Sequence, residues 1–306
     1  MKKQILVLEE LGIERNEFVK LANALEFEFI WNKTDIEISK LEGIVTVKTK
    51  IDSELLNRFP NLKFVAVAFT GYDCVDIDLC NKKNISVFNV PDYSSNSVAE
   101  LVIAQAISLL REIPKAHNTL ISGNWELGTG KELFGKTVGI LGTGKIGLTT
   151  ALYFKTLGCN IIAWSKTKKT ELERIGTYID DKKDFFSKAD IITIHLPLNN
   201  KTNGIIGKNE LKAMKKTAYL INSARGPIVN EEALIEVLQN KEIAGAALDV
   251  YTNEPIKLKN PLLKLENVIL TPHIAYKTEE ALIRRAQITI DNIIAFENNK
   301  EQNKVN

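Results

Sequence analysis

The chain has 306 residues, enough for two domains that each bury a core of their own. Its 40 basic and 38 acidic side chains nearly balance, which argues against a nucleic-acid partner because nucleic-acid-binding proteins concentrate basic charge. The three cysteines show neither metal-ligand spacing nor a disulfide framework, so we predict no metal site and a cytoplasmic location. No apolar segment is long enough to span a bilayer, so no membrane partner is expected.

Short apolar runs alternate with amphipathic segments from the first residues onward. In the first third, the expected strands are 5–8, 27–31, 43–47, 63–68 and 85–90. Later in the chain, the expected strands are 138–141, 161–164, 191–195, 219–222, 245–250 and 268–271. Alternation of strands with helical segments predicts an α/β protein with two doubly wound parallel sheets, each covered by helices.

A domain boundary is expected near residues 94–97. Ser97-Val98-Ala99-Glu100 has the form of a capping box, which predicts the start of a long helix that runs to Leu110. Pro114 should end or kink this helix. The last helix is expected at about 278–297 and should pack on the first domain.

A glycine-rich turn follows the predicted strand 138–141. Gly142, Gly144 and Gly147 form a GxGxxG pattern that opens a predicted helix. In such turns the glycines permit a tight turn, close approach of the backbone to a pyrophosphate, and close packing of helix on strand. The amides at the helix start attract the phosphates. The position of the motif between a strand and a helix predicts a dinucleotide-binding loop.

The residues after the next predicted strand indicate which dinucleotide binds. An acidic residue that binds the ribose 2′-hydroxyl is expected there, but the chain has Ser165 followed by Lys166. Two charges about 4 Å apart at a protein surface interact by up to ~4 kcal/mol, enough to select a 2′-phosphate. We therefore predict NADP(H) in preference to NAD(H). The competing interpretation is an exposed turn whose lysines serve solubility.

Arg225, Glu254 and His273 each follow one of the last three predicted strands. Ligands of parallel sheets bind at the carboxyl ends of the strands, so these side chains should converge beside the dinucleotide loop. A planar guanidinium suits a substrate carboxylate, and a histidine can donate a proton near neutral pH. A carboxylate beside that histidine would orient the ring and favour its protonated form. His117 and His195 are interpreted as structural, with His195 lining the cofactor cleft.

With these residues, the chain resembles the D-isomer-specific 2-hydroxyacid dehydrogenase family along nearly its whole length. Beyond the glycine loop, the matching motifs are Gly71-Tyr-Asp-Cys-Val-Asp76, Ser97-Val-Ala-Glu100, Asn222-Ser-Ala-Arg-Gly226, Ala247-Leu-Asp-Val-Tyr-Thr-Asn-Glu-Pro255 and Thr271-Pro-His-Ile-Ala275. The resemblance implies a flavodoxin-like substrate domain, residues 1–97 with 280–306, and an inserted Rossmann NAD(P)-binding domain, 98–279. It also implies a homodimer with the long helix after Ser97 at the interface.

The resemblance implies the same catalytic set: Arg225 binds the substrate, His273 is the proton donor, and Glu254 is the partner of His273. The cofactor contacts that it implies are Thr70, Gly142, Gly144, Lys145, Ile146, Gly147, Ser165, Lys166, Leu196, Pro197, Ser223, Ala224, Arg225, Asp249, His273 and Tyr276. The substrate carboxylate is implied to meet backbone around Val47, Lys48, Thr70 and Gly71, besides Arg225. Tyr276 is expected to narrow the pocket.

Ser165-Lys166 is similar to the NADP-preferring glyoxylate and hydroxypyruvate reductases of this family, so the leading hypothesis is such a reductase using NADPH. A D-3-phosphoglycerate dehydrogenase, with Lys48 or Lys50 holding the substrate phosphate, is the second hypothesis. A nucleotide-sensing, corepressor-like binding protein is a third, which the compact length disfavours. A Rossmann methyltransferase is disfavoured because it needs no set of Arg, Glu and His in its cleft.

Overall fold

The computed structural model describes residues 2–31, 33–126 and 128–306. The chain forms two compact units, Met1–Tyr93 with Lys277–Asn306, and Ser94–Tyr276. The predicted division, 1–97 with 280–306 against 98–279, differs from these bounds by a few residues. The capping box at Ser97 was wrong: helix α4 (Ser95–Arg111) has Ser94 at its N-cap, and the Ser97 hydroxyl donates to the Ser94 carbonyl oxygen at 3.2 Å.

The first unit contains a five-stranded parallel sheet in the order β2-β1-β3-β4-β5, which is the flavodoxin-like order. Its strands are β1 (Lys3–Val7), β2 (Phe27–Ile30), β3 (Leu41–Thr46), β4 (Phe64–Val67) and β5 (Ser86–Phe88). Its helices are α1 (Arg15–Leu21), α2 (Ser53–Arg58), α3 (Ile77–Lys82) and α11 (Glu279–Glu297). The central strands are buried along their length because helices cover both faces.

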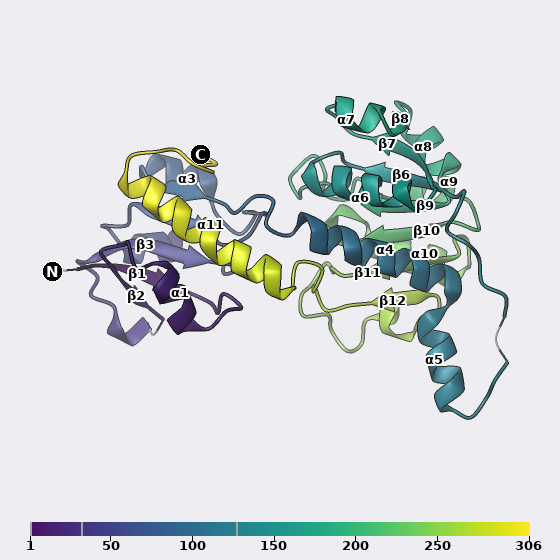
Figure 1. Ribbon diagram of the computed structural model, residues 1–306, viewed down its shortest axis with the longest axis horizontal. Helices are drawn as coiled ribbons and strands as arrows, with labels where there is room; N and C mark the ends of the chain where they lie inside the picture. Colours follow the sequence, from purple (N-terminus) through teal and green to yellow (C-terminus); the bar gives the residue numbers. More distant parts are fainter. Residues whose placement is uncertain (1, 32, 127) are drawn as a thin grey trace. The chain divides into compact units, whose positions relative to one another are not determined.

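Helix α11 belongs to the first unit and lies across its sheet (Figure 1). The predicted start is confirmed: Thr278 is the N-cap, and its hydroxyl accepts a hydrogen bond from the Ala281 amide at 3.3 Å. Near its end the Phe296 ring packs 4.7 Å from the Phe64 ring, centroid to centroid. This aromatic contact ties the C-terminal segment to the sheet, as predicted.

The second unit contains a seven-stranded parallel sheet in the order β12-β11-β10-β9-β6-β7-β8, with the strand order reversing between β6 and β9 as in Rossmann folds. Its strands are β6 (Thr137–Leu141), β7 (Asn160–Trp164), β8 (Gly176–Tyr178), β9 (Ile191–Ile194), β10 (Tyr219–Asn222), β11 (Gly245–Leu248) and β12 (Val268–Leu270). Besides α4, its helices are α5 (Ile113–Ile121), α6 (Lys145–Thr156), α7 (Thr170–Glu173), α8 (Lys182–Lys188), α9 (Lys208–Ala213) and α10 (Glu231–Gln239). The predicted fold class is therefore confirmed.

Strand β8 was missed in the sequence. It has three residues, lies at the edge of the sheet and pairs only with β7. Gly176, Thr177 and Tyr178 form no apolar run, so neither periodicity nor hydropathy marks them as a strand. Pro114 acts as predicted, because α4 ends at Arg111 and Pro114 lies in the first turn of α5.

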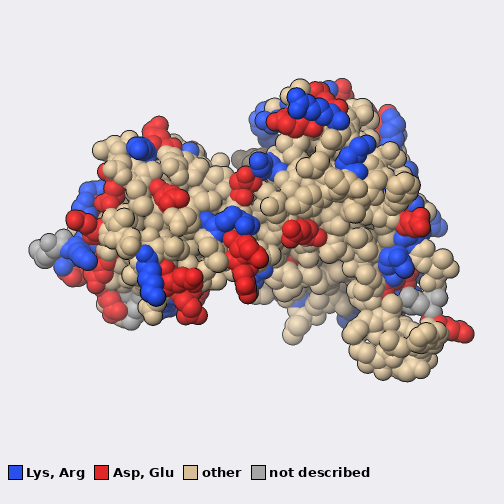
Figure 2. Space-filling view, viewed as in Figure 1, with Lys and Arg blue, Asp and Glu red and all other residues tan. Residues whose placement is uncertain are grey.

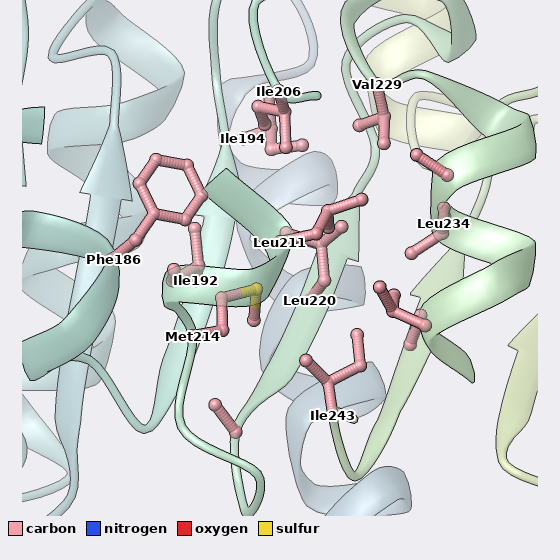
Figure 3. Close-up of a cluster of buried hydrophobic side chains, with 14 of the residues drawn as sticks. Phe186, Ile192, Ile194, Ile206, Leu211, Met214, Leu220, Val229, Leu234 and Ile243 are labelled. Atoms are coloured by element: carbon pink, nitrogen blue, oxygen red, sulfur yellow. The ribbon is translucent and has the colours of Figure 1, made fainter. Parts of the chain in front are cut away.

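The core of the second unit fixes the strands whose ends carry the polar residues. Ile192 and Ile194 of β9 and Leu220 of β10 pack against Leu211 and Leu234 from helices α9 and α10 (Figure 3). Fully burying a side chain of this size contributes about 1.5–3 kcal/mol, so the cluster stabilises this part of the sheet. Among the helices of the described residues, none combines the length and apolarity that crossing a bilayer requires.

Candidate active site

The glycine-rich turn has the shape that a dinucleotide needs. Gly142 has φ +98°, and a Cβ there would lie 2.7 Å from the His195 carbonyl oxygen. A Cβ on Gly147 would lie 2.1 Å from the Gly142 oxygen, whereas one on Gly144 would meet nothing within 4 Å. Helix α6 carries no acidic residue in its first turn, so its amides favour an anion. These residues fit the pyrophosphate of a nicotinamide dinucleotide.

Hydrogen bonds connect the loop after β7 to the glycine-rich turn. The Thr143 amide donates to the Ser165 hydroxyl oxygen at 3.5 Å. The Tyr178 hydroxyl donates to Thr143 Oγ1 at 2.9 Å and accepts from the Lys169 amide at 2.9 Å. Tyr178 lies on the strand that the sequence did not reveal. The loop that should distinguish the two cofactors is therefore fixed beside the phosphate-binding turn.

The lysines of this loop differ in their surroundings. Lys168 Nζ forms a surface ion pair with Asp180 at 2.7 Å. Lys166 is exposed and makes no ion pair with any residue that the structure describes. Ser165 and Lys166 therefore offer a hydroxyl and an unneutralised cation where an acidic residue would repel a phosphate.

A histidine and a carboxylate form a close pair at the end of the sheet. His273 Nδ1 and Glu254 Oε2 are 2.6 Å apart, with 12% of the His273 side chain and 31% of the Glu254 side chain exposed. The Tyr251 amide donates to the other Glu254 oxygen at 3.2 Å and so fixes the carboxylate. The Tyr276 ring meets the His273 ring edge to face. With Nδ1 donating to Glu254, a proton given to a substrate comes from Nε2.

Asp249 holds the backbone on which His273 lies. Its buried carboxylate accepts hydrogen bonds from Thr271 Oγ1 at 2.6 Å and from the amides of Ile274 and Ala275 at 2.8 Å each. His273 itself has φ +53°, a left-handed conformation that costs a non-glycine residue about 1–3 kcal/mol. The bonds on both sides of His273 stabilise this conformation, so Asp249 sets the position of the imidazole.

Two further residues that sequence reasoning missed support this segment. The Tyr251 hydroxyl donates to the Leu248 and Thr271 carbonyl oxygens at 3.1 and 2.9 Å. Burial, together with nearby carboxylates, raises the pKa of Tyr251 to about 12, so its hydroxyl remains a donor. The Gln105 amide donates to Thr271 Oγ1 at 3.4 Å and accepts from Ser223 at 3.2 Å, which connects β12 to β10. The only signals in the sequence were a polar residue within an apolar helix for Gln105 and a place in the quoted motif 247–255 for Tyr251.

Arg225 is positioned by the strand end before it. Asn222, 1% exposed, donates to the Arg225 carbonyl oxygen at 3.0 Å and accepts from the Ala224 amide at 3.1 Å. The next residue, Gly226, must lack a side chain, because a Cβ there would lie 2.0 Å from the Tyr251 carbonyl carbon. Arg225 is half-buried on the same edge of the sheet as His273. A cation, a proton donor and a dinucleotide turn thus share one edge, which suits hydride transfer to a carboxylate-bearing carbonyl compound.

Comparisons with known proteins agree with this chemistry. The sequence model of the D-isomer specific 2-hydroxyacid dehydrogenase NAD-binding domain matches residues 103–275. The chain is 40% identical over 271 residues to a glyoxylate reductase from Thermococcus litoralis, covering 85% of this chain and 82% of that protein. The chain belongs to the D-isomer-specific 2-hydroxyacid dehydrogenase family. The predicted family and the predicted enzyme class, an oxidoreductase, are confirmed.

Other members of the family bear different names. A D-3-phosphoglycerate dehydrogenase from Archaeoglobus fulgidus is 37% identical over 302 residues, which cover 95% of this chain. The chain spans about half of that protein, 56% of its length. The structure of an NADPH-dependent glyoxylate/hydroxypyruvate reductase from Sinorhizobium meliloti, in complex with NADP and malonate, has a TM-score of 0.88 and 29% identity. That likeness covers 100% of this chain and 97% of the other.

His195 has a structural place in this member of the family. Burial lowers the pKa of its imidazole to about 3, so the ring is neutral at physiological pH and donates no catalytic proton. Its Nε2 lies 3.0 Å from Thr193 Oγ1. The next residue, Leu196, lies against the glycine turn, because a Cβ on Gly142 would be 2.9 Å from its Cδ2. Pro197 is exposed, and its carbonyl oxygen accepts a hydrogen bond from Thr202.

The residues predicted to meet the substrate carboxylate, Arg225 apart, lie in the first unit. The amides of Val47 and Lys48 donate to Glu9 at 2.6 and 2.8 Å. The Thr70 hydroxyl donates to the Val90 carbonyl oxygen at 3.0 Å, and Gly71 follows it in a half-buried loop. Contact of these residues with substrate, and of Thr70 with cofactor, stays a prediction.

Proposed function

We propose that the protein is an NAD(P)-dependent oxidoreductase that interconverts a small 2-keto acid and its D-2-hydroxy acid. Its substrate would be glyoxylate or hydroxypyruvate, with NADPH as reductant. The observation that supports this most is the pair of His273 and Glu254, 2.6 Å apart on the sheet edge that also carries the glycine turn and Arg225. The glyoxylate reductases among the relatives support the same substrate class.

In this proposal each residue of the site has a separate role in carbonyl reduction. A nicotinamide dinucleotide, held by the glycine turn and the loop at Ser165, would supply the hydride that the carbonyl carbon receives. Arg225 binds the substrate carboxylate through its planar guanidinium. His273 donates the Nε2 proton to the carbonyl oxygen, so the substrate gains one hydride and one proton and becomes a hydroxy acid. Glu254 accepts a hydrogen bond from Nδ1 and so orients the ring for this transfer. The reverse reaction returns the proton to His273.

Initial rates with four keto acids test the proposal. Purified protein is mixed with NADPH or NADH and with glyoxylate, hydroxypyruvate, pyruvate or phosphohydroxypyruvate. We expect the highest kcat/KM with NADPH and glyoxylate or hydroxypyruvate. Fastest turnover of phosphohydroxypyruvate would instead establish a phosphoglycerate dehydrogenase. Nucleotide binding without turnover of any keto acid would contradict the proposal and favour a nucleotide-sensing, corepressor-like binding protein.

The phosphoglycerate dehydrogenase alternative has specific support. A relative of that name covers 95% of this chain. Lys48 is exposed in the loop after β3 and could hold a phosphate. Lys50 is the other candidate, and its Nζ lies 3.7 Å from an Asp52 oxygen.

The preference for NADPH rests on Ser165 and Lys166. We expect the double variant Ser165→Asp with Lys166→Ala to weaken NADPH binding at least tenfold, because the new carboxylate repels the 2′-phosphate and the cation is lost. NADH binding should hold or improve. Dissociation constants from nicotinamide fluorescence measure both. A Lys212→Ala variant, which removes an exposed lysine from α9, is the control. Equal loss of both cofactors would contradict this assignment.

We also propose a homodimer that uses the α4–α5 region. Helix α5 has no buried residue and projects from its unit (Figure 1), and Figure 2 shows few charged side chains there. Large exposed apolar side chains lie on α5 and in the segment directly after it: Ile113, Leu120, Ile121 and Trp125. Ile121 and Trp125 are 72% and 87% exposed. Contiguous apolar surface of this kind often marks a protein–protein interface, and we propose that a second copy of the chain covers it. Their burial would supply the hydrophobic part of the interface.

Light scattering after size exclusion tests the dimer. We expect twice the chain mass of 34.2 kDa for the wild type and a shift toward the single-chain mass for Ile121→Asp. Val19→Asp, at an exposed apolar position of α1, should leave the mass unchanged. A wild-type protein with the mass of one chain would contradict the dimer.

The last part of the proposal is a cytoplasmic location. Cys74, Cys80 and Cys159 are thiols and not disulfides, as a reducing compartment permits. Burial raises the pKa of Cys80 and of Cys159 to about 11, so both thiols stay protonated and unreactive.

A further inference from the structure

The carboxylate of Glu9 organises the loop that follows β3. Its Oε2 accepts hydrogen bonds from Thr46 Oγ1 at 2.9 Å and from the Val47 amide at 2.6 Å. Its Oε1 accepts from the amides of Lys48 at 2.8 Å and Thr49 at 2.6 Å. Three successive amides thus converge on one half-buried carboxylate, in the way that backbone nests bind anions.

This arrangement determines what the loop can offer a substrate. The amides of Val47 and Lys48 already donate to Glu9, so an incoming carboxylate would have to compete for them. The Lys48 side chain is exposed, and its Nζ lies 5.9 Å from the centre of the Phe69 ring. Phe69 directly precedes Thr70 and Gly71. The loop therefore places a cation beside the segment predicted to meet the substrate carboxylate.

The charge state of Glu9 agrees with a permanent role in the loop. Burial alone would raise the pKa of this carboxyl, but the hydrogen bonds from Val47, Lys48, Thr46 and Thr49 outweigh burial and lower it. Glu9 is therefore ionised at physiological pH, where its hydrogen bonds are charge-assisted and strong. Its neighbour Glu10 is exposed and pairs with Arg15, without contact to the loop.

We propose that Glu9 is a positioning residue that fixes the 46–49 loop, so that the Lys48 ammonium binds the carboxylate of the keto-acid substrate as a second cation besides Arg225. This inference rests on the proposed function. It assigns to the loop a side-chain contact with substrate in place of the backbone contact at Val47 and Lys48.

Kinetics of Glu9→Gln test the proposal. A glutamine keeps one acceptor oxygen, but its amide nitrogen would face an N–H of the loop. Some of the four hydrogen bonds that the Glu9 carboxylate accepts are therefore lost. Because small misplacement of a binding group has large effects, we expect KM for the keto acid to rise about tenfold and kcat to change less than threefold. The dissociation constant of NADPH should not change. Glu10→Gln is the matched control, with wild-type KM expected.

A double-mutant cycle separates positioning from a general structural role. If Glu9 acts through Lys48, then Glu9→Gln should have little further effect on KM in a Lys48→Met background. Hydrogen exchange of the segment containing the amides of residues 47–49 should be faster in Glu9→Gln, whatever the activity. Additive effects of the two substitutions, or an unchanged KM despite faster exchange, would overturn the proposal. A wild-type protein that reduces no keto acid would instead overturn the proposed function.

Discussion

Replacing His273 with glutamine is expected to lower kcat by about 10²–10⁴-fold, the usual contribution of a positioned proton donor. Glutamine keeps a polar side chain of similar reach but cannot donate a proton to the developing alkoxide. The dissociation constant of NADPH should stay within about twofold of wild type, because the glycine turn and the Ser165 loop are untouched. Single-turnover rates and nicotinamide fluorescence measure the two quantities.

The partner of His273 provides an internal comparison for this experiment. Glu254→Gln leaves the imidazole in place but removes the charged acceptor 2.6 Å from its Nδ1. We expect its loss in kcat to be smaller than that of His273→Gln, and the double variant to be no slower than His273→Gln alone, since Glu254 acts through the ring. Loss of kcat by less than about tenfold in His273→Gln would exclude His273 as the general acid.

Replacing Asp249 with alanine should affect stability and activity together. The substitution leaves a hydroxyl and two amides without their buried acceptor, at a cost of about 1–3 kcal/mol for each unsatisfied group. With partial relaxation, we expect the free energy of unfolding to fall by about 3 kcal/mol. We also expect kcat to fall, because the left-handed backbone at His273 loses the bonds that stabilise it.

Urea unfolding and steady-state kinetics measure these effects. Asp184→Ala serves as the control, because this exposed aspartate pairs with a surface lysine on its own helix, and such a pair contributes little to stability. A variant of Asp249 with wild-type unfolding and wild-type kcat would show that the segment from Thr271 to Ala275 holds its shape by other means.

The features that were predicted correctly from the sequence are those that depend on local sequence patterns. The strand–turn–helix around Gly142 and the start of α11 at Thr278 depend on residues close together in the chain, and both hold in the structure. Strand β8 was not predicted because it is short and polar and lies at a sheet edge. The capping box at Ser97 misplaced a helix start because Ser94 occupies the cap three residues earlier.

The residues that organise the site could not be predicted, because their partners are distant in sequence. Gln105 on α4 contacts Thr271, Asp249 contacts Ala275, and Glu9 contacts Thr49. Neither periodicity nor motif spacing encodes such pairs. A buried polar residue must satisfy its hydrogen-bonding groups, but the sequence alone does not say where the partner lies. Asn222 illustrates this limit: it stands in a quoted motif, yet its support of Arg225 emerged only from the fold.

The division of the chain into two units has a consequence for how this family can diversify. Arg225, Glu254 and His273 all lie within Ser94–Tyr276 and are held by hydrogen bonds internal to that unit. The 46–49 loop is held by Glu9 inside the other unit. Under the proposed function, mutations in the loop can change substrate choice without altering the hydrogen bonds that hold His273. Selection can thus act on substrate preference and on turnover as two nearly independent traits of one gene.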